Sequence, residues 1–196
     1  MNIPAKLACI ATITFLSACA GTQPARHITL DDGRPPVAKS STTPGIAVIR
    51  ANVPDLVDRP QLVLRSDGNH VALSEQYRWA EPLRREIPRL IAKDLGDLLD
   101  SNHVAALPAE EAGFTVDFKI ALDFQQLDTV VGTGVDIDVI WRVEPHTGDS
   151  FVGRSSFRQP LAGPATDIPA LVSTERLALR RVATEITKAI ALYQKN

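Results

Sequence analysis

The feature that most restricts the fold of this chain is an alternating run of eleven residues, "FTVDFKIALDF", at 114–124. Apolar side chains occupy every second position, and polar or small side chains lie between them. Because successive side chains of a strand point to opposite faces, the run predicts a strand with one face on the core and the other toward water. The segments 135–144 and 151–158 repeat this alternation and predict a three-stranded meander.

Two longer segments have apolar residues at three- and four-residue spacing and predict amphipathic helices. The first covers 77–100, where Pro82 suits the opening turn but Pro88 removes a backbone donor from the interior. We expect a kink at Pro88, or a main helix that begins there. The second helix is expected from Asp167, which can cap it, to Tyr193.

Shorter strands are expected at 46–53, at 102–108 and in a hairpin within 61–74 that turns at Asp67-Gly68. The order of strands, helix, strands and helix is typical of an α+β fold. We therefore predict a largely antiparallel β-sheet with two helices packed on one face.

This α+β domain is expected to span 46–196. The preceding segment, 19–45, is rich in Pro, Ser, Thr and Gly, which is typical of a tether or linker. A short strand is expected within it at 27–30.

Residues 1–18 have the layout of a signal peptide, with a lysine before an apolar run too short to span a bilayer. The run ends in "LSAC", which resembles the bacterial lipobox, where the Cys19 thiol receives a diacylglyceryl group. A disulfide with Cys9 is disfavoured because Cys9 would be removed with the signal peptide. We therefore expect Cys19 to be a lipidation site, since two or three acyl chains anchor a protein stably. Ala20 after it favours the outer membrane.

Composition excludes several classes of protein. The net charge is -2, so the chain lacks the positive field that binds nucleic acid, and no nucleic-acid partner is expected. No stretch after residue 20 approaches the roughly 20 apolar residues that cross a bilayer. After cleavage a single cysteine would remain, which excludes an internal disulfide.

The sequence contains no convincing catalytic or metal-binding set. Its four histidines lie in separate segments, whereas a zinc site or a catalytic base needs close partners. Carboxylate pairs on the predicted strands share their polar faces with cations, which indicates ion pairs on a solvated surface rather than a glycosidase or calcium site. We expect no enzyme activity, no cofactor and no metal. The residues considered are His27, His70, His103 and His146, then Asp117, Asp123, Asp136 and Asp138, with Lys119 and Arg142.

The stretch 53–99 resembles the PqiC family, also called the YmbA-like or ABC-type transport auxiliary lipoproteins. These proteins show "DRPQ" before a strand, an Asn in a short turn, and "WAEPL" opening a helix, and the lipobox agrees with this pattern. Pro88 departs from the small or apolar residue usual in that helix. The matching residues are Asp58, Arg59, Pro60, Gln61, Asn69, Trp79, Ala80, Glu81, Pro82 and Leu83.

The resemblance implies a non-enzymatic, outer-membrane-anchored periplasmic lipoprotein subunit of an MCE-type intermembrane lipid transport system that supports envelope integrity. Its implied partners are an MCE-domain conduit protein and the inner-membrane component of that system. The resemblance is compatible with a homo-oligomeric ring, which the residues themselves do not indicate. The alternative is a stand-alone envelope lipoprotein that carries a lipid or scaffolds envelope assembly. The apolar stripes look just sufficient to pack on each other, which counts against an internal lipid cavity.

Four residues of the motif form a candidate partner-binding cluster. We expect Arg59, Gln61, Trp79 and Glu81 to lie together, with Arg59 forking onto a carboxylate such as that of Glu81. Two interpretations of Trp79 stay open. It is either a core residue that closes the helix against the sheet or an exposed anchor for a partner.

Overall fold

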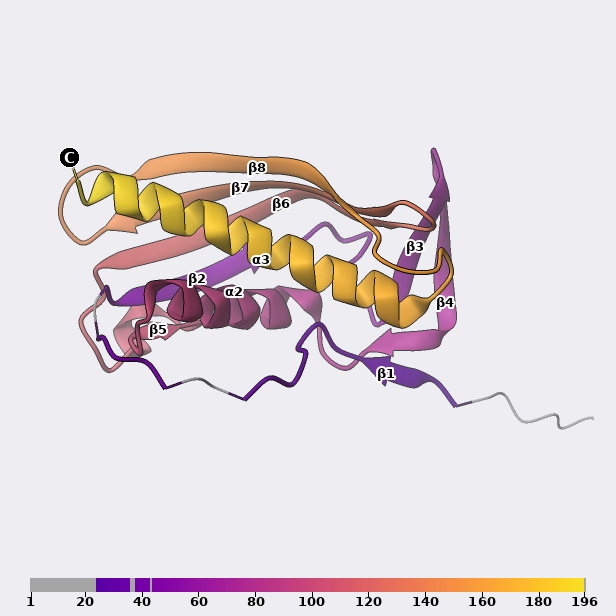
Figure 1. The fold of residues 1–196 in the computed structure, drawn as a ribbon, viewed down its shortest axis with the longest axis horizontal. Helices are drawn as coiled ribbons and strands as arrows, with labels where there is room; N and C mark the ends of the chain where they lie inside the picture. Colours follow the sequence, from indigo (N-terminus) through magenta and orange to yellow (C-terminus); the bar gives the residue numbers. More distant parts are fainter. Residues whose placement is uncertain (1–23, 36–37, 43, 196) are drawn as a thin grey trace, which may run out of the picture.

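The computed structural model describes residues 24–35, 38–42 and 44–195. The signal peptide and Cys19 lie outside the described residues. Within them a sheet forms one layer and two helices form another (Figure 1). The elements are β1 Arg26–Ile28, β2 Ile46–Asn52, β3 Gln61–Asp67, β4 His70–Trp79, α2 Leu83–Leu99, β5 Val104–Ala105, a 3₁₀ turn Ala109–Glu111, β6 Phe118–Val130, β7 Gly134–Pro145, β8 Phe151–Pro160 and α3 Ile168–Tyr193.

The described sheet has eight strands and is mixed, so the prediction of a largely antiparallel sheet is wrong. Four of its strand pairings are parallel: β1 with β4, β2 with β5, β2 with β6, and β3 with β6. The three antiparallel pairings are the β3–β4 hairpin and the β6–β7–β8 meander. The difference arises because α2 lies between β2 and its partners β5 and β6, and such a helical crossover lets the chain return in the same direction.

Strand β6 is the centre of the sheet, because β2, β3 and β7 all pair with it. It begins at Phe118, later than the alternation predicted, and continues to Val130. The amides of Asp117 and Phe118 donate to the Gly45 carbonyl, while the Gly45 amide donates to the Asp117 carboxylate at 2.7 Å. These contacts join the residue before β2 to the residues at the start of β6, just before the two strands begin to pair.

Both helices lie in front of the sheet in Figure 1, as expected for two helices on one face. α2 packs on β2, α3 packs on β7 and β8, and the helices contact each other. α2 begins at Leu83 and continues through the buried Pro88, so the alternative of a main helix beginning at Pro88 is wrong. The predicted start at residue 77 is also wrong, because residues 77–79 form the end of β4. None of the described helices is long and apolar enough to cross a membrane.

Part of the segment predicted as a tether is built into the fold. β1, expected at 27–30 and observed at Arg26–Ile28, pairs with β4 at an edge of the sheet. Leu30 follows it and is 1% exposed within the hydrophobic core. The N-terminal chain therefore reaches the body of the domain well before residue 46.

Candidate functional site

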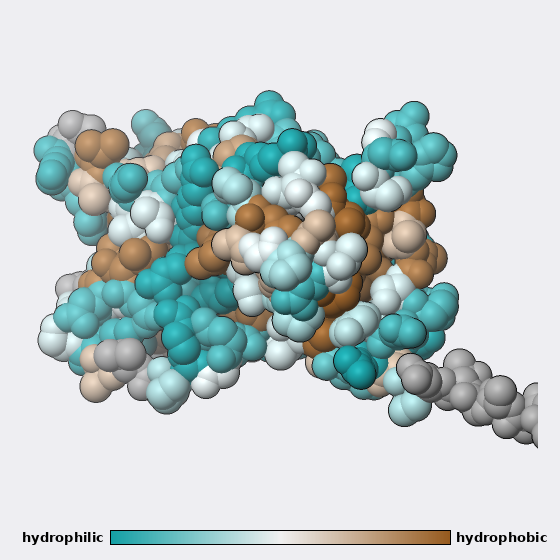
Figure 2. Space-filling view, turned by 45° about the vertical axis from the view of Figure 1, so that its right-hand side comes forward, coloured by the Kyte–Doolittle hydropathy of each residue, from teal (hydrophilic) through white to brown (hydrophobic). Residues whose placement is uncertain are grey.

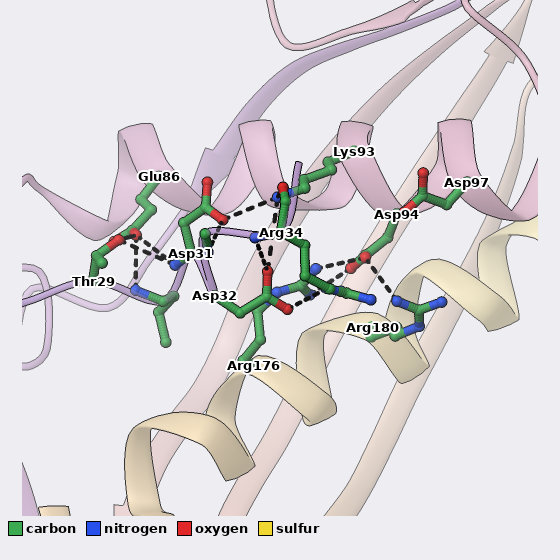
Figure 3. Close-up of polar contacts among 12 residues, drawn as sticks. Thr29, Asp31, Asp32, Arg34, Glu86, Lys93, Asp94, Asp97, Arg176 and Arg180 are labelled. Atoms are coloured by element: carbon green, nitrogen blue, oxygen red, sulfur yellow. Dashed lines mark hydrogen bonds and ion pairs between the residues drawn. The ribbon is translucent and has the colours of Figure 1, made fainter. Parts of the chain in front are cut away.

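The segment after β1 is fastened to α2 by a buried carboxylate (Figure 3). Glu86 Oε1 accepts hydrogen bonds from the Leu30 amide at 2.8 Å, from the Asp31 amide at 3.2 Å and from the Thr29 hydroxyl. Its other oxygen is buried without a hydrogen-bond partner among the described residues. Glu86 thus fixes the chain at the point where it leaves the sheet.

A second buried group joins α2 to α3. Asp94 accepts two hydrogen bonds from the Arg176 guanidinium, at 2.5 and 2.6 Å, and Arg180 lies 3.7 Å away. Burial opposes the charge of Arg176, but these bonds and the charge of Asp94 outweigh it and raise the pKa of Arg176. One carboxylate is therefore shared by two guanidinium groups.

The loop after β1 makes ion pairs through its charged side chains at the exposed side of this network. Lys93 contacts the Asp31 carboxylate at 3.0 Å, and Arg34 contacts Asp32 at 2.5 Å. The hydrogen bond from Lys93 is the main cause that lowers the pKa of Asp31, against a smaller opposing effect of burial. The loop therefore meets α2 through its charged side chains, as Figure 3 shows.

A cleft of about 790 Å³ adjoins this network, between the segment of β1 and the first half of α3. Figure 2 views the molecule from the end that carries β1 and the start of α3, and hydrophobic residues gather near the centre of that face. The apolar lining residues are Ile28, Leu30, Pro169, Val172 and Leu177, and Arg34, Arg176 and Arg180 are the cationic ones.

Glu175 is the remaining buried acid of this region. Its side chain accepts a hydrogen bond from the Thr129 hydroxyl at 3.0 Å, and Oε1 has no partner among the described residues. Burial raises the pKa of Glu175 to about 7, and the nearby Glu86 charge adds to this rise. The carboxyl is therefore partly protonated near neutral pH.

The structure places the residues of the candidate partner-binding cluster around a second pocket, of about 390 Å³. Arg59, Trp79 and Glu81 line it, and Gln61 lies next to it at the start of β3, opposite Arg78. Glu81 pairs with Arg89 rather than with Arg59. Arg59 Nε is buried without a hydrogen-bond partner in the described part of the chain.

Trp79 is the aromatic residue that lines this second pocket. It is 6% exposed and belongs to the hydrophobic core, and its amide donates to the Pro60 carbonyl at 2.7 Å. This position matches the interpretation of Trp79 as a core residue. The exposed lining residues of this pocket are Pro60, Ala80 and Arg84, while Arg59 and Glu81 are half-buried and the Asp58 side chain is only 8% exposed.

The polar faces of β7 and β8 carry ion pairs. Arg158 contacts Asp136 and Arg154 contacts Asp138, each at 2.5 Å. In the described ranges no three His, Cys, Asp or Glu residues are grouped to hold a metal ion.

Sequence reasoning missed the first cleft and the buried charges beside it. A signal for the charges was present, because Glu86, Leu90 and Asp94 follow one another in steps of four along the apolar stripe of α2. On α3, Glu175 lies in the apolar stripe in the same way, three residues after Val172 and four before Leu179. A charged residue at a stripe position indicates a buried ion or hydrogen-bond pair, but not its partner.

The chain matches the family model of the ABC-type transport auxiliary lipoprotein component over residues 29–187. It belongs to this family. The match begins at Thr29 and so includes the loop bound by Glu86, all of α2, most of α3 and most of the residues that line the cleft. An auxiliary lipoprotein of an ABC-type transport system is membrane-anchored, and its auxiliary role is non-catalytic.

Two solved structures share the fold of this auxiliary lipoprotein. The crystal structure of an uncharacterized protein has a TM-score of 0.64 and 13% identity, covering 86% of this chain and 99% of that one. Protein XCC0632 from Xanthomonas campestris, of family model DUF330, has a TM-score of 0.55 and 17% identity, covering 84% and 89%. Comparison with curated proteins finds no match.

Proposed function

We propose that this auxiliary lipoprotein is an outer-membrane-anchored subunit of an MCE-type intermembrane lipid transport system, facing the periplasm and supporting envelope integrity. The observation that carries the proposal is the family match over residues 29–187, which covers most of the chain after the lipobox. The lipobox at Cys19 supports the anchor, and Ala20 supports the outer membrane.

The position of β1 supports a membrane-proximal domain. Residues 20–25 alone separate Cys19 from Arg26, the first residue of β1. A fully extended chain gains at most about 3.6 Å per residue, so this tether spans no more than roughly 25 Å. Because β1 is part of the sheet, the end of the domain that carries it stays close to an anchored Cys19.

The surface proposed to meet the MCE-domain protein is the second pocket with Arg59, Gln61, Trp79 and Glu81. Arg59, Glu81 and Arg84 supply polar and charged groups at this surface, and Trp79 supports them from the core. The inner-membrane component of the same system is the second proposed partner. Assembly of several copies into a ring would repeat this surface around the end of a conduit.

The test is a crosslinked pull-down of the full lipidated chain from intact envelopes, with partners identified by mass spectrometry. We expect an MCE-domain protein, recovered less from Cys19→Ala and from Arg59→Ala. Arg154→Ala, an exposed change on β8, is the matched control and should leave recovery unchanged. Recovery of phospholipid without any MCE-domain protein would instead support the stand-alone lipid carrier.

A further inference from the structure

The cleft beside β1 has the size and lining of a site for a small amphiphile. Its volume of about 790 Å³ lies within the range of roughly 300–1,000 Å³ typical of ligand sites. Leu177 on its α3 wall is 50% exposed and lines the cleft together with Ile28 and Val172. An acyl chain placed there would remove this apolar surface from water, which is favourable in proportion to the area covered.

Among the ion-paired side chains on the polar side of the cleft, cations outnumber carboxylates by one. Asp94 supplies a single negative charge to both Arg176 and Arg180, while Arg34 is balanced by Asp32. Asp31 is likewise balanced by Lys93.

Two properties of the cationic residues mark this side as a site for an anion. Arg176 lines the cleft at 5% exposure, and its Nε has no hydrogen-bond partner among the described residues. The Arg180 side chain is 36% exposed and meets Asp94 only at 3.7 Å, so its guanidinium has donors left for an incoming oxygen. An anionic group would balance the surplus charge.

We propose that this cleft binds one anionic phospholipid, with an acyl chain along Ile28, Val172 and Leu177 and the phosphate beside Arg180. The proposal deepens the proposed role in lipid transport and rests on it for the supply of lipid. The short tether to Cys19 keeps the cleft beside the bilayer from which such a lipid would come. The acyl chains on Cys19 share the apolar chemistry but lack the phosphate that the guanidinium groups require.

The test uses the full lipidated chain in nanodiscs that contain a phosphatidylglycerol or a phosphatidylcholine with a photoactivatable acyl chain. Labelled peptides are identified by mass spectrometry. We expect phosphatidylglycerol to label the 168–180 region of α3 more strongly than phosphatidylcholine does. Arg180→Gln should reduce this preference, because it removes the surplus charge.

Variants at exposed apolar positions of α3 separate the site from general lipid contact. Leu177→Asn should lower labelling of 168–180 by about tenfold, the factor that corresponds to losing the burial of roughly two methylene groups without a change of charge. Leu177→Met should retain labelling. Leu192→Asn, at a 64% exposed position near the other end of α3, should also leave it unchanged.

Three results would overturn the proposal. The first is equal labelling by the two lipids, and the second is labelling that Leu177→Asn does not lower. The third is a marked gain in labelling when Cys19→Ala removes the anchor, which would make the anchor the occupant. Pull-down of Leu177→Asn separates the two proposals. A variant that loses lipid labelling but still recovers the MCE-domain partner affects the cleft alone. A wild-type chain that is labelled by lipid but recovers no MCE-domain partner contradicts only the proposed transport role.

Discussion

Glu175 is the buried acid whose surroundings compensate its charge least. Asp94 has Arg176, and Glu86 has two backbone amides, but Glu175 receives one hydroxyl and faces the charge of Glu86. A carboxyl in such a position is more easily buried when it is protonated. The chain therefore contains one core residue whose charge state changes near neutral pH.

Glu175 should make the stability of the protein fall as pH rises. Its pKa is about 7 in the folded chain against an ordinary 4.5, so the folded state binds more protons between these values. The stabilisation is complete below pH 4.5 and is lost as pH rises through 7, by at most about 3 kcal/mol. Glu175→Gln, measured by urea unfolding from pH 5 to 8, should flatten this slope. Glu110→Gln on the exposed turn should not, and an unchanged slope in Glu175→Gln would contradict the assignment.

Gly153 on β8 should not tolerate a side chain. A Cβ at this position would lie 2.1 Å from the Trp141 ring, which packs over the glycine. Gly153→Ala should therefore lower the free energy of unfolding by about 1–3 kcal/mol, the usual cost of overpacking. Urea unfolding followed by tryptophan fluorescence measures this loss. Ser156→Ala, at an exposed position on the same strand, should change stability little.

At the scale of elements, α2 and α3 are joined by a charged contact inside an otherwise apolar interface. The Asp94 side chain is 0% exposed, and it fixes how the two helices meet through Arg176. A buried ion pair of this kind fixes the register of the two helices, whereas apolar contacts alone allow one helix to slide along the other. The same contact places Arg176 and Arg180 at the cleft.

Breaking this contact on one side should be costly. Asp94→Ala leaves Arg176 buried and unpaired and should lower the free energy of unfolding by about 3–5 kcal/mol. The double variant Asp94→Leu with Arg176→Met should recover much of that loss, because no buried charge remains. Asp138→Ala, which breaks the exposed pair with Arg154, should cost less than about 1 kcal/mol. A double variant as unstable as Asp94→Ala would argue against this account.

At the scale of the whole molecule, the N-terminal segment completes both the sheet and the hydrophobic core. β1 completes an edge of the sheet, Leu30 enters the core, and the backbone of Leu30 and Asp31 satisfies Glu86. An anchor at the proposed lipidation site Cys19 would be separated only by residues 20–25 from β1, a structural element of the sheet. We therefore expect the fold to restrict the orientation of the domain at the membrane.

Truncation tests this dependence. A chain that begins at residue 46 loses the burial of Leu30 and leaves Glu86 buried without its partners, together worth about 3 kcal/mol or more. Its Tm should fall by about 10 °C relative to a chain that begins at residue 24. Thermal unfolding by circular dichroism measures the difference. Equal Tm values would place the domain boundary at 46, as the sequence pattern suggested.

Local pattern was sufficient to predict the helices, the β3–β4 hairpin and the β6–β8 meander, because side-chain periodicity and turn residues act between near neighbours in the chain. The motif around Arg59 and Trp79 likewise identified the family. The parallel pairing of β2 with β6 had no such signal, since alternation defines the faces of a strand but not which strand lies beside it.

The sequence alone thus determined most of the elements of this protein, though not where β4 ends and α2 begins, and its resemblance to the auxiliary lipoproteins, while the anchor at Cys19 stays a prediction. Only the tertiary structure decided the mixed sheet, the burial of Glu86, Asp94 and Glu175, and the cleft between β1 and α3. The physical reason is that these features depend on contacts between residues 46 to 82 positions apart, such as Arg176 with Asp94. Such contacts form when whole elements pack, and no local pattern records them.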